Sequence, residues 1–398
     1  MTRTKTRVVI LVPSMMTGGM EQCTSLLMKH FSRDYFELEL VTIFDRPPFF
    51  KIPSDVRLHI LEKSPGQTSA KPHVQLSSGA TRKRNDAMLW LGVVASKLGS
   101  LVSEIQPDVI LAQDIYATVI ALMAKKEMKT TPKIVGTVHI ICSNFLQQVD
   151  FGDLFAHLLR QYLQDADALV AVGNSVASDL IMHFGARQNQ MTVIQNPFDF
   201  EEVERLSHQN LDEDAALYGQ IPTVLFVGRL AHQKGLVYLF QAIALARKLQ
   251  EVRCVIVGDG EERDQLEATV ELLGISSNVT FLGRVQNAFK YMRAATCFVL
   301  PSLVEGVPYA VIEAMACGCP VIATESNPDL GELLGDNERG ILVPPRNFYA
   351  LAEAILRVVW DKNLRKKLTE AGTRHVKHFD RSDAVLRYER LLKSVTAF

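Results

Sequence analysis

The strongest constraint on the fold is a recurring pattern of short, uniformly apolar runs separated by stretches with helical periodicity. In the first half of the chain the runs are RVVILVPS, ELELVTIF, RLHIL, DVILAQ, KIVGTVH, ALVAVG and MTVIQN. In the second half they are TVLFVG, CVIVG, VTFLG, CFVLP, PVIAT and GILVP. Runs rich in Val, Ile and Leu without alternation are typical of parallel strands that are covered on both faces. The pattern therefore predicts two doubly wound α/β sheets in succession.

The length of 398 residues also favours two domains, because a single hydrophobic core rarely grows that large. We expect a first Rossmann-like domain at 1–198 and a second at 199–380. The acidic, polar segment that follows Asn196 lacks a buried-strand run, and it is interpreted as the interdomain connection with a surface helix. The last segment, 381–398, is expected to form a helix that can pack back across both domains.

Composition narrows the function. The net charge of −1 gives no overall field that would favour nucleic acid. No apolar run is expected to span a membrane, and the basic N-terminus leads into a strand and a Gly-Gly loop instead of a signal-peptide cleavage site. Six cysteines without paired spacing indicate free thiols in a reducing compartment, so we expect a cytoplasmic protein.

No metal site is expected. The sequence Asp165-Ala166-Asp167 matches the D-x-D pattern of some metal-dependent sugar transferases, but it lies between a helix end and a strand. Acidic residues in such a connection commonly serve turn and capping chemistry, and we interpret the pair in that way.

The stretch from Pro301 to Thr324 carries the first candidate site. A turn with Glu305 follows a buried strand, and a helix predicted from Tyr309 carries Glu313 one turn further on. Ligands of open parallel sheets bind at the carboxyl ends of the strands, beside helix N-termini. Carboxylates there can accept hydrogen bonds from sugar or ribose hydroxyls. The alternative is that Glu305 is an ordinary turn residue and that Glu313 lies on a solvated helix face.

Two cations follow the first strand of the second half, in VGRLAHQKG. Arg229 comes at the end of the strand, and Lys234 directly precedes the glycine that opens a helix. Two cations at a helix N-terminus suit a diphosphate, although isolated surface cations are usually only solvated. Gly258 and Gly260 allow another close backbone approach, but Arg263 replaces the last glycine of a dinucleotide fingerprint, which argues against a dehydrogenase.

The first half offers two further candidates. Gly18-Gly19 precedes a helix and resembles a phosphate-binding turn, although a tight structural turn explains it equally well. His139 ends the KIVGTVH strand, where it is expected to point into the interdomain crevice, in either a structural or a functional role.

Residues 62–86 are predicted to form a long loop, and the segment DAMLWLGVVASKLGSLVSEI is predicted to form a helix with Trp90 at its start. The simple interpretation is a core-facing helix behind a solvated basic loop. The alternative is an anionic membrane surface bound through 71–100, where Arg82, Lys83 and Arg84 would meet lipid head groups. Such contact would place the protein on the inner face of the membrane.

Taken together, these motifs resemble the retaining glycosyltransferases of family 4, which have the two-domain GT-B fold. The resemblance runs from GGME through VGRLAHQKG, VGDGEERDQL and FLGRV to EGVPYAVIEAMACGCPVIAT and GILVPP. It implies two Rossmann-like domains facing a crevice, an acceptor-binding first domain and a nucleotide-sugar donor bound by the second. Many family members have Gly-Phe-Gly after the first Glu, whereas Pro308 here lacks one backbone N–H donor.

The resemblance also implies residue roles. It gives catalytic roles to four residues: His139, Arg229, Lys234 and Glu305. Around the donor it places Gly18, Gly19, Gly228, Arg229, Lys234, Gly258, Arg284, Val285, Glu305, Gly306, Val307, Pro308, Tyr309 and Glu313. Arg229 and Lys234 would bind the diphosphate, Glu313 the ribose and Glu305 the donor sugar.

The implied reaction is metal-independent transfer of a hexosyl or N-acetylhexosaminyl unit, with retention, from a nucleotide sugar, of which UDP-sugar is the expected form. The acceptor would be a glycan or a lipid-linked sugar in polysaccharide or glycolipid assembly. No cofactor and no nucleic acid partner are expected. Two other functions fit the same fold: a nucleotide-sugar epimerase or hydrolase, and a non-catalytic nucleotide-sugar-binding protein.

Overall fold

The structure, a computed structural model, describes residues 5–397 except 17, 63–79, 127, 129–130, 148 and 306–307, and the side chains of 80–83 and 378 are also outside it. It separates into two compact units. The first unit contains Met1–Phe198 together with Arg381–Phe398, and the second contains Asp199–Asp380.

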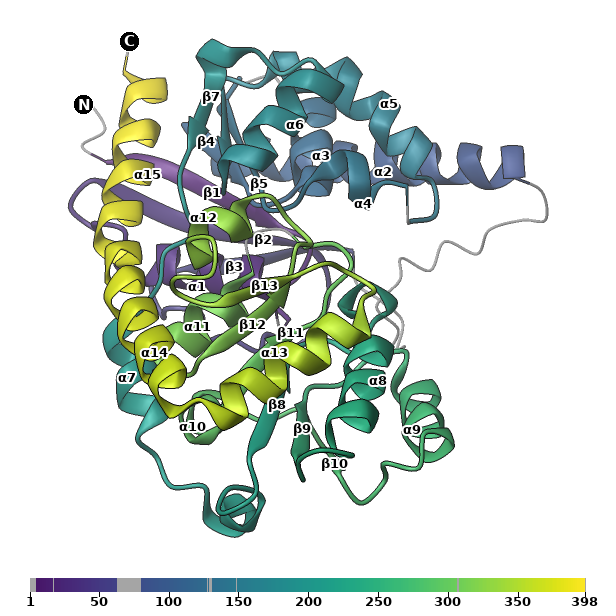
Figure 1. Ribbon diagram of the computed structural model, residues 1–398. Coiled ribbons are helices and arrows are strands. Elements are labelled where there is room, and N and C mark those ends of the chain that lie inside the picture. Colours follow the sequence, from purple (N-terminus) through teal and green to yellow (C-terminus); the bar gives the residue numbers. More distant parts are fainter. Residues whose placement is uncertain are drawn as a thin grey trace. The chain divides into compact units, whose positions relative to one another are not determined.

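The first unit is built on one parallel sheet with strand order β3-β2-β1-β4-β5-β6-β7 (Figure 1). Its strands are β1 (Thr6–Val12), β2 (Phe36–Phe44), β3 (Arg57–Glu62), β4 (Val109–Ala112), β5 (Lys133–Val138), β6 (Ala168–Ala171) and β7 (Met191–Val193). In register, Val8 of β1 lies between Leu38 of β2 and Val109 of β4. The chain order reverses beside β1, which is where doubly wound sheets bind ligands.

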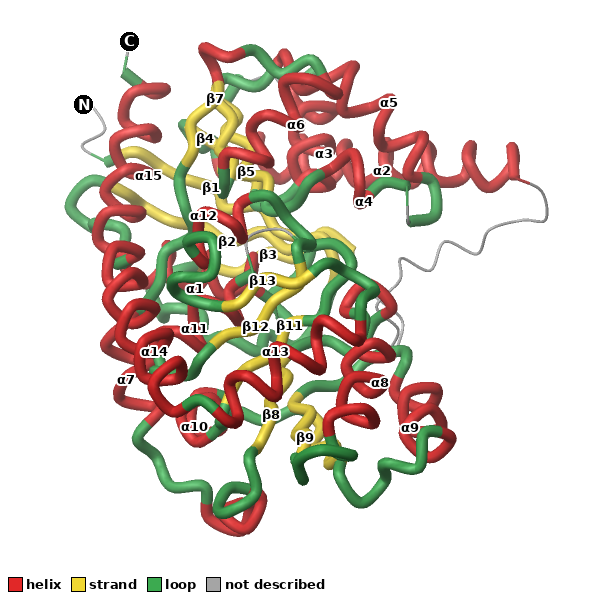
Figure 2. The backbone as a smooth tube through the Cα atoms, in the orientation of Figure 1, coloured by secondary structure: helices red, strands yellow, loops and turns green. Residues whose placement is uncertain are grey.

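Helices flank this sheet, as the red and yellow segments of Figure 2 show. They are α1 (Gly19–His30), α2 (Ala80–Ile105), α3 (Ile115–Lys125), α4 (Cys142–Phe145), α5 (Gly152–Tyr162), α6 (Asn174–Phe184) and α15 (Arg381–Thr396). On one face, Leu27 of α1 and Tyr388 of α15 join the core formed by Val8 and Ile10. Helix α3 packs on β4 and β5, and α2 packs against α3. The last helix thus belongs to the first unit.

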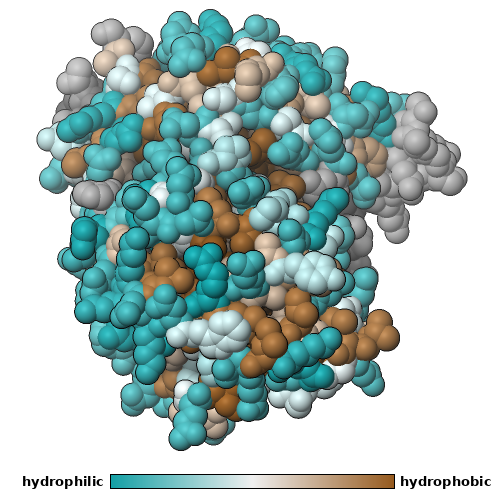
Figure 3. Space-filling model, in the orientation of Figure 1, coloured by the Kyte–Doolittle hydropathy of each residue, from teal (hydrophilic) through white to brown (hydrophobic). Residues whose placement is uncertain are grey.

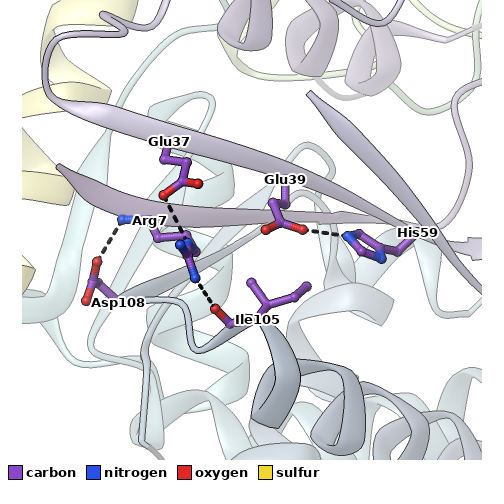
Figure 4. Close-up of polar contacts among 6 residues, drawn as sticks. All are labelled: Arg7, Glu37, Glu39, His59, Ile105 and Asp108. Carbon is purple, nitrogen blue, oxygen red and sulfur yellow. Dashed lines mark hydrogen bonds and ion pairs between the residues drawn. The ribbon is translucent and has the colours of Figure 1, made fainter. Parts of the chain in front are cut away.

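Polar contacts join the sheet strands near the amino-terminal ends of β1 and β4 (Figure 4). The backbone N–H of Arg7 donates to Asp108 at 2.7 Å, and its side chain donates to Glu37 at 3.1 Å and to the carbonyl of Ile105. His59 and Glu39 pair between β3 and β2 at 2.5 Å. These contacts lie toward the amino-terminal ends of the strands, away from the edge at which doubly wound sheets bind ligands.

The second unit repeats the architecture, with strand order β10-β9-β8-β11-β12-β13. Its strands are β8 (Thr223–Val227), β9 (Arg253–Val257), β10 (Val279–Gly283), β11 (Cys297–Leu300), β12 (Val321–Thr324) and β13 (Ile341–Val343). Its helices are α7 (Phe200–Ser207), α8 (Leu236–Ala246), α9 (Arg263–Leu272), α10 (Phe289–Ala294), α11 (Tyr309–Ala316), α12 (Asp329–Leu334), α13 (Phe348–Trp360) and α14 (Lys362–Val376). Helix α8 packs against α13, and α11 against α14. The predicted parallel α/β class is confirmed.

Helix α2 corrects two expectations. It begins at Ala80 and not after residue 86, because the Arg- and Lys-rich segment is favourable for helix and is continuous with the apolar part. Its segment Arg84–Ile105 is also long and apolar enough to cross a membrane, by length and composition alone. However, Leu91 and Leu98 lie in the core of the first unit, so the segment also has the burial of a sheet-covering helix. Residues 71–79 lie outside the described residues.

The surface in Figure 3 is mostly hydrophilic, with apolar patches between. All six cysteines are buried and unpaired. Asp167 of the D-x-D sequence accepts hydrogen bonds from Lys125 Nζ at 2.8 Å and from the Ile134 N–H at 2.9 Å, and it pairs with Lys133. That carboxylate is therefore engaged in structural contacts, but these are ion pairs and a contact with β5, and not the turn or capping contacts that the sequence predicted.

Candidate active site

The candidate site of the second unit lies at the carboxyl edge of its sheet. Strands β8 and β11 are neighbours, and each ends in a loop that leads to the N-terminus of a helix, α8 or α11. Lys234 precedes α8, and Glu305 precedes α11. Because parallel neighbours end at the same edge, two residues separated by 71 positions are brought into contact.

Lys234 and Glu305 form the central ion pair. Lys234 Nζ lies 2.5 Å from Glu305 Oε1, and the side chains are only 18% and 9% exposed. The hydroxyl of Ser302, which is fully buried, donates to the same carboxylate oxygen at 2.5 Å. Charge-assisted hydrogen bonds of this length are the strong ones. Among the described residues, Glu305 Oε2 has no hydrogen-bond partner and can accept one from a ligand hydroxyl.

The loop that carries Glu305 is tied down by its neighbours. The backbone N–H of Glu305 donates to the carbonyl of Ser326 at 3.2 Å, and the carbonyl of Glu305 accepts from Asn327 Nδ2 at 3.1 Å. The Leu303 N–H donates to the carbonyl of Gln233, next to Lys234, at 2.7 Å. The two loops are therefore joined by backbone as well as by the ion pair.

Glycines permit the close approach of these loops. Gly235 has a φ of +61°, and a Cβ there would lie 2.3 Å from the carbonyl oxygen of Pro301. Gly258 has a φ of +135°, and a Cβ would lie 1.9 Å from the carbonyl oxygen of Gly228. No side chain fits at either position without movement of the backbone.

The remaining candidates of the second unit are variously exposed. The side chains of Arg229 and Arg284 are exposed and make no ion pair with described residues, whereas Val285 and Glu313 are half-buried. Gly228 follows β8 in an extended conformation with a φ of 159°. Pro308 and Tyr309 are buried at the start of α11. Gly306 and Val307 lie outside the described residues. Arg229 is thus exposed after β8, whereas Lys234 is largely buried in its contact with Glu305.

The candidates of the first unit lie at the carboxyl edge of the other sheet. Gly18 is exposed at the N-terminus of α1, which begins at Gly19. His139 follows β5, and its Nε2 lies 3.2 Å from Gln113 Oε1, directly after β4. Burial lowers the pKa of His139 to about 4, partly opposed by the Asn196 side chain, so the imidazole is neutral at pH 7.

Two carboxyl groups at this edge were missed by sequence reasoning. Burial raises the pKa of Asp114 to about 7, with a further contribution from the charge of Glu21, and burial also raises the pKa of Glu21 to about 7. Asp114 accepts a hydrogen bond from the Ala117 N–H at 2.6 Å and so caps α3. The signal that could have found Asp114 and Gln113 is their place after a strand, the same argument that selected His139.

Within the described residues, no group of three or more His, Cys, Asp or Glu side chains is arranged to hold a metal ion. The charged groups of the second unit's site are instead the buried Lys234–Glu305 ion pair, the exposed guanidiniums of Arg229 and Arg284, and the half-buried carboxylate of Glu313. This combination suits an anionic ligand that also carries hydroxyl groups.

Comparison with known proteins agrees with this chemistry. Residues 17–202 match the family model Glycosyltransferase Family 4, and residues 207–375 match Glycosyl transferases group 1. A Campylobacter jejuni relative is 27% identical over 94% of this chain and 95% of its own. Its name is N-acetylgalactosamine-N,N'-diacetylbacillosaminyl-diphospho-undecaprenol 4-alpha-N-acetylgalactosaminyltransferase.

Solved structures share the fold over nearly the whole chain. Anabaena HepE in complex with UDP superposes with a TM-score of 0.72 at 21% identity, covering 98% of this chain and all of that one. Sucrose-phosphate synthase from Thermosynechococcus elongatus gives 0.80 at 20% identity, covering 98% and 99%. Two Rossmann-like units and a charged sheet edge thus define a glycosyltransferase with the GT-B fold. The chain belongs to glycosyltransferase family 4.

Proposed function

We propose that this glycosyltransferase uses a UDP-sugar and moves a hexosyl or N-acetylhexosaminyl unit to a glycan or lipid-linked acceptor, with retention and without a metal. The observation that carries the proposal is the buried Lys234–Glu305 pair, together with the exposed Arg229 in the same loop after β8 as Lys234. A nucleotide sugar presents a diphosphate and several hydroxyls, which are the partners that these cations and carboxylates prefer. UDP occupies the HepE structure, which supports the choice of base.

In this proposal the cationic residues bind the diphosphate, and the carboxylates bind hydroxyl groups. Arg229 and Lys234 bind the diphosphate. Before the ligand binds, Glu305 partly neutralises the positive charge of Lys234. Glu305 Oε2 accepts from a hydroxyl of the sugar, while Glu313 accepts from the ribose. Gly306 and Val307, Arg284 and Val285, and the Gly18–Gly19 turn complete the donor contacts in this proposal.

Fixed cations explain how the reaction proceeds without a metal. Negative charge develops on the diphosphate as the sugar–oxygen bond breaks, and preorganised positive groups stabilise that charge. The resemblance to retaining members implies attack on the same face from which the diphosphate leaves. His139, as a neutral imidazole, then acts as a hydrogen-bonding group near the reacting sugar and not as a positive charge.

The acceptor is proposed from the named relative, whose name describes transfer to a diphospho-undecaprenol-linked sugar. A lipid-linked acceptor requires access to a membrane surface. Helix α2 exposes Leu89 and Val93 one turn apart, after the basic segment that contains Arg84. We propose that this helix contacts anionic lipid on the cytoplasmic side, with apolar side chains inserted and basic ones at the head groups.

A panel of nucleotide sugars tests the function. Each donor is incubated with and without lipid-linked oligosaccharide acceptors, in the presence and absence of EDTA, and both released nucleoside diphosphate and glycosylated product are measured. The proposal expects acceptor-dependent release from one UDP-sugar that EDTA does not change. Product with an inverted anomeric centre, or release that needs a divalent metal, would contradict it.

The same panel separates the alternatives. A hydrolase or epimerase would convert the donor at an undiminished rate without acceptor. A non-catalytic binding protein would bind the nucleotide sugar and release nothing.

A further inference from the structure

Gln113 and His139 form a hydrogen-bonded pair at the carboxyl edge of the first unit's sheet. They follow the neighbouring strands β4 and β5, and the Gln113 side chain is fully buried. The contact joins His139 Nε2 and Gln113 Oε1 at 3.2 Å. Gln113 is held in place by its backbone, since its N–H donates to the carbonyl of Leu11 at 2.9 Å.

The chemistry of the contact fixes the position of the imidazole proton. The structure places the amide oxygen of Gln113, and not its nitrogen, against Nε2 of His139. An amide oxygen only accepts a hydrogen bond, so in this arrangement Nε2 donates and carries the proton. In a neutral imidazole, Nδ1 then has the free lone pair. Burial keeps the ring neutral at pH 7, because it lowers the pKa of His139 to about 4.

Three buried polar atoms around this pair have no hydrogen-bond partner among the described residues: Gln113 Nε2, His139 Nδ1 and Asn196 Oδ1. Asn196 follows β7 at the same edge, and its side chain partly opposes the lowering of the His139 pKa, so it lies close to the imidazole. Buried polar atoms without partners are rare and need an explanation. A sugar hydroxyl is a fitting partner, because it donates one hydrogen bond and accepts others, and it carries no charge into a neutral environment.

We propose that Gln113 is a positioning residue, which holds His139 in the Nε2–H tautomer so that Nδ1 accepts a hydrogen bond from a hydroxyl of the substrate. The substrate part of this inference rests on the proposed function, whereas the tautomer part does not. Without Gln113, the carbonyl of Asn196 is the competing acceptor. It would draw the proton to Nδ1 and turn the lone pair away from the substrate.

The tautomer is measured directly by long-range ¹H–¹⁵N NMR correlation of the histidine ring nitrogens in the full-length protein at pH 7.5, with His139→Gln used to assign the signals. The wild type is expected to show one pyrrole-like Nε2 and one pyridine-like Nδ1. Gln113→Met keeps a similar side-chain length but lacks the acceptor, and is expected to show a measurable Nδ1–H population. An unchanged Nε2–H pattern in Gln113→Met would overturn the positioning role.

The matched control is Gln190→Met. Gln190 is also a buried glutamine of the first unit, and it donates to the carbonyl of Leu163 and accepts from Arg187. It precedes β7, whereas Asn196 follows that strand, so it lies at the opposite edge of the sheet. Its substitution is expected to lower stability without changing the His139 signals, which separates loss of a buried amide from loss of the tautomer.

Transfer kinetics test the substrate part. Gln113→Met is expected to lower kcat/KM by roughly tenfold, as for one lost hydrogen bond, with Gln190→Met near the wild-type value. A changed tautomer with unchanged transfer would overturn the substrate role of His139 Nδ1. If the wild type transfers no sugar at all, the proposed function fails while the NMR result still decides the positioning role.

Discussion

Nζ of Lys234 lies 2.5 Å from Oε1 of Glu305, and both side chains are largely withdrawn from solvent before any donor is bound. The pair has two roles that experiments can separate. It neutralises a buried carboxylate, and it presents a cation at the place where a diphosphate is expected. Loss of either partner leaves the other in a poorly solvated position.

Lys234→Met should therefore reduce both stability and activity. We expect a loss on the order of 2 kcal/mol in the free energy of unfolding, because Glu305 keeps only the Ser302 hydroxyl. Urea denaturation measures this loss. Lys248 is exposed two residues after the end of α8, and Lys248→Met is the control that should behave like the wild type. Adding Glu305→Gln to Lys234→Met should restore part of the stability but none of the transfer; equal stability of single and double variants would contradict the pairing.

Gly235→Ala should be strongly destabilising. The residue has a positive φ, and its Cβ would meet the backbone carbonyl of Pro301, which cannot move without displacing the Glu305 loop. We expect a loss of about 2 kcal/mol or more. Gly219→Ala is the matched control in the same unit, because a Cβ there meets nothing within 4 Å. Similar melting temperatures for the two variants would show that the close approach is not as described.

Asp114 gives a pH dependence with a definite sign. Its pKa rises from 3.8 to about 7 on folding, so between these pH values the folded state holds a proton that the unfolded state releases. Stability therefore falls as the pH rises through this window. Asp114→Asn keeps an acceptor for the Ala117 N–H but does not titrate. The decline between pH 5 and pH 8 should shrink by about 2 kcal/mol.

Urea unfolding at the two pH values checks this prediction. The exposed Asp34 provides the control, since Asp34→Asn should leave the wild-type slope unchanged. Part of the slope should persist in Asp114→Asn, because Glu21 also titrates with a raised pKa. A steeper decline in Asp114→Asn than in the wild type would contradict the raised pKa.

The sequence was sufficient to predict the strands and to identify candidate site residues directly after them. Apolar runs of five to eight residues mark the strands, since strands buried on both faces leave little choice of residue type. Arg229, Glu305 and His139 were found because polar residues at strand ends stand out against those runs. The start of α2 was missed because a charged segment without apolar periodicity is read as loop, although its residues favour helix.

The contacts between site residues could not be predicted from the sequence. Nothing in the spacing of Lys234 and Glu305 says that they touch, because contact depends on β8 and β11 being neighbours in the sheet. The burial of Lys234 follows from that contact, so the sequence alone does not reveal it. Gln113 was not predicted as a site residue because its amide side chain is uncharged and does not stand out at a strand end. Its contact with His139 is seen only in the structure.

The central claim is that the edge of β8 and β11 in the second unit binds the nucleotide diphosphate of the donor. Its most direct test is titration calorimetry of UDP into the full-length wild type, Arg229→Ala and the control Lys248→Ala, each with EDTA. We predict that the wild type and Lys248→Ala bind with equal affinity and that Arg229→Ala binds at least tenfold more weakly, without a change in melting temperature in the absence of UDP. Equal affinity of Arg229→Ala and the wild type, or no binding by the wild type in EDTA, would contradict the account.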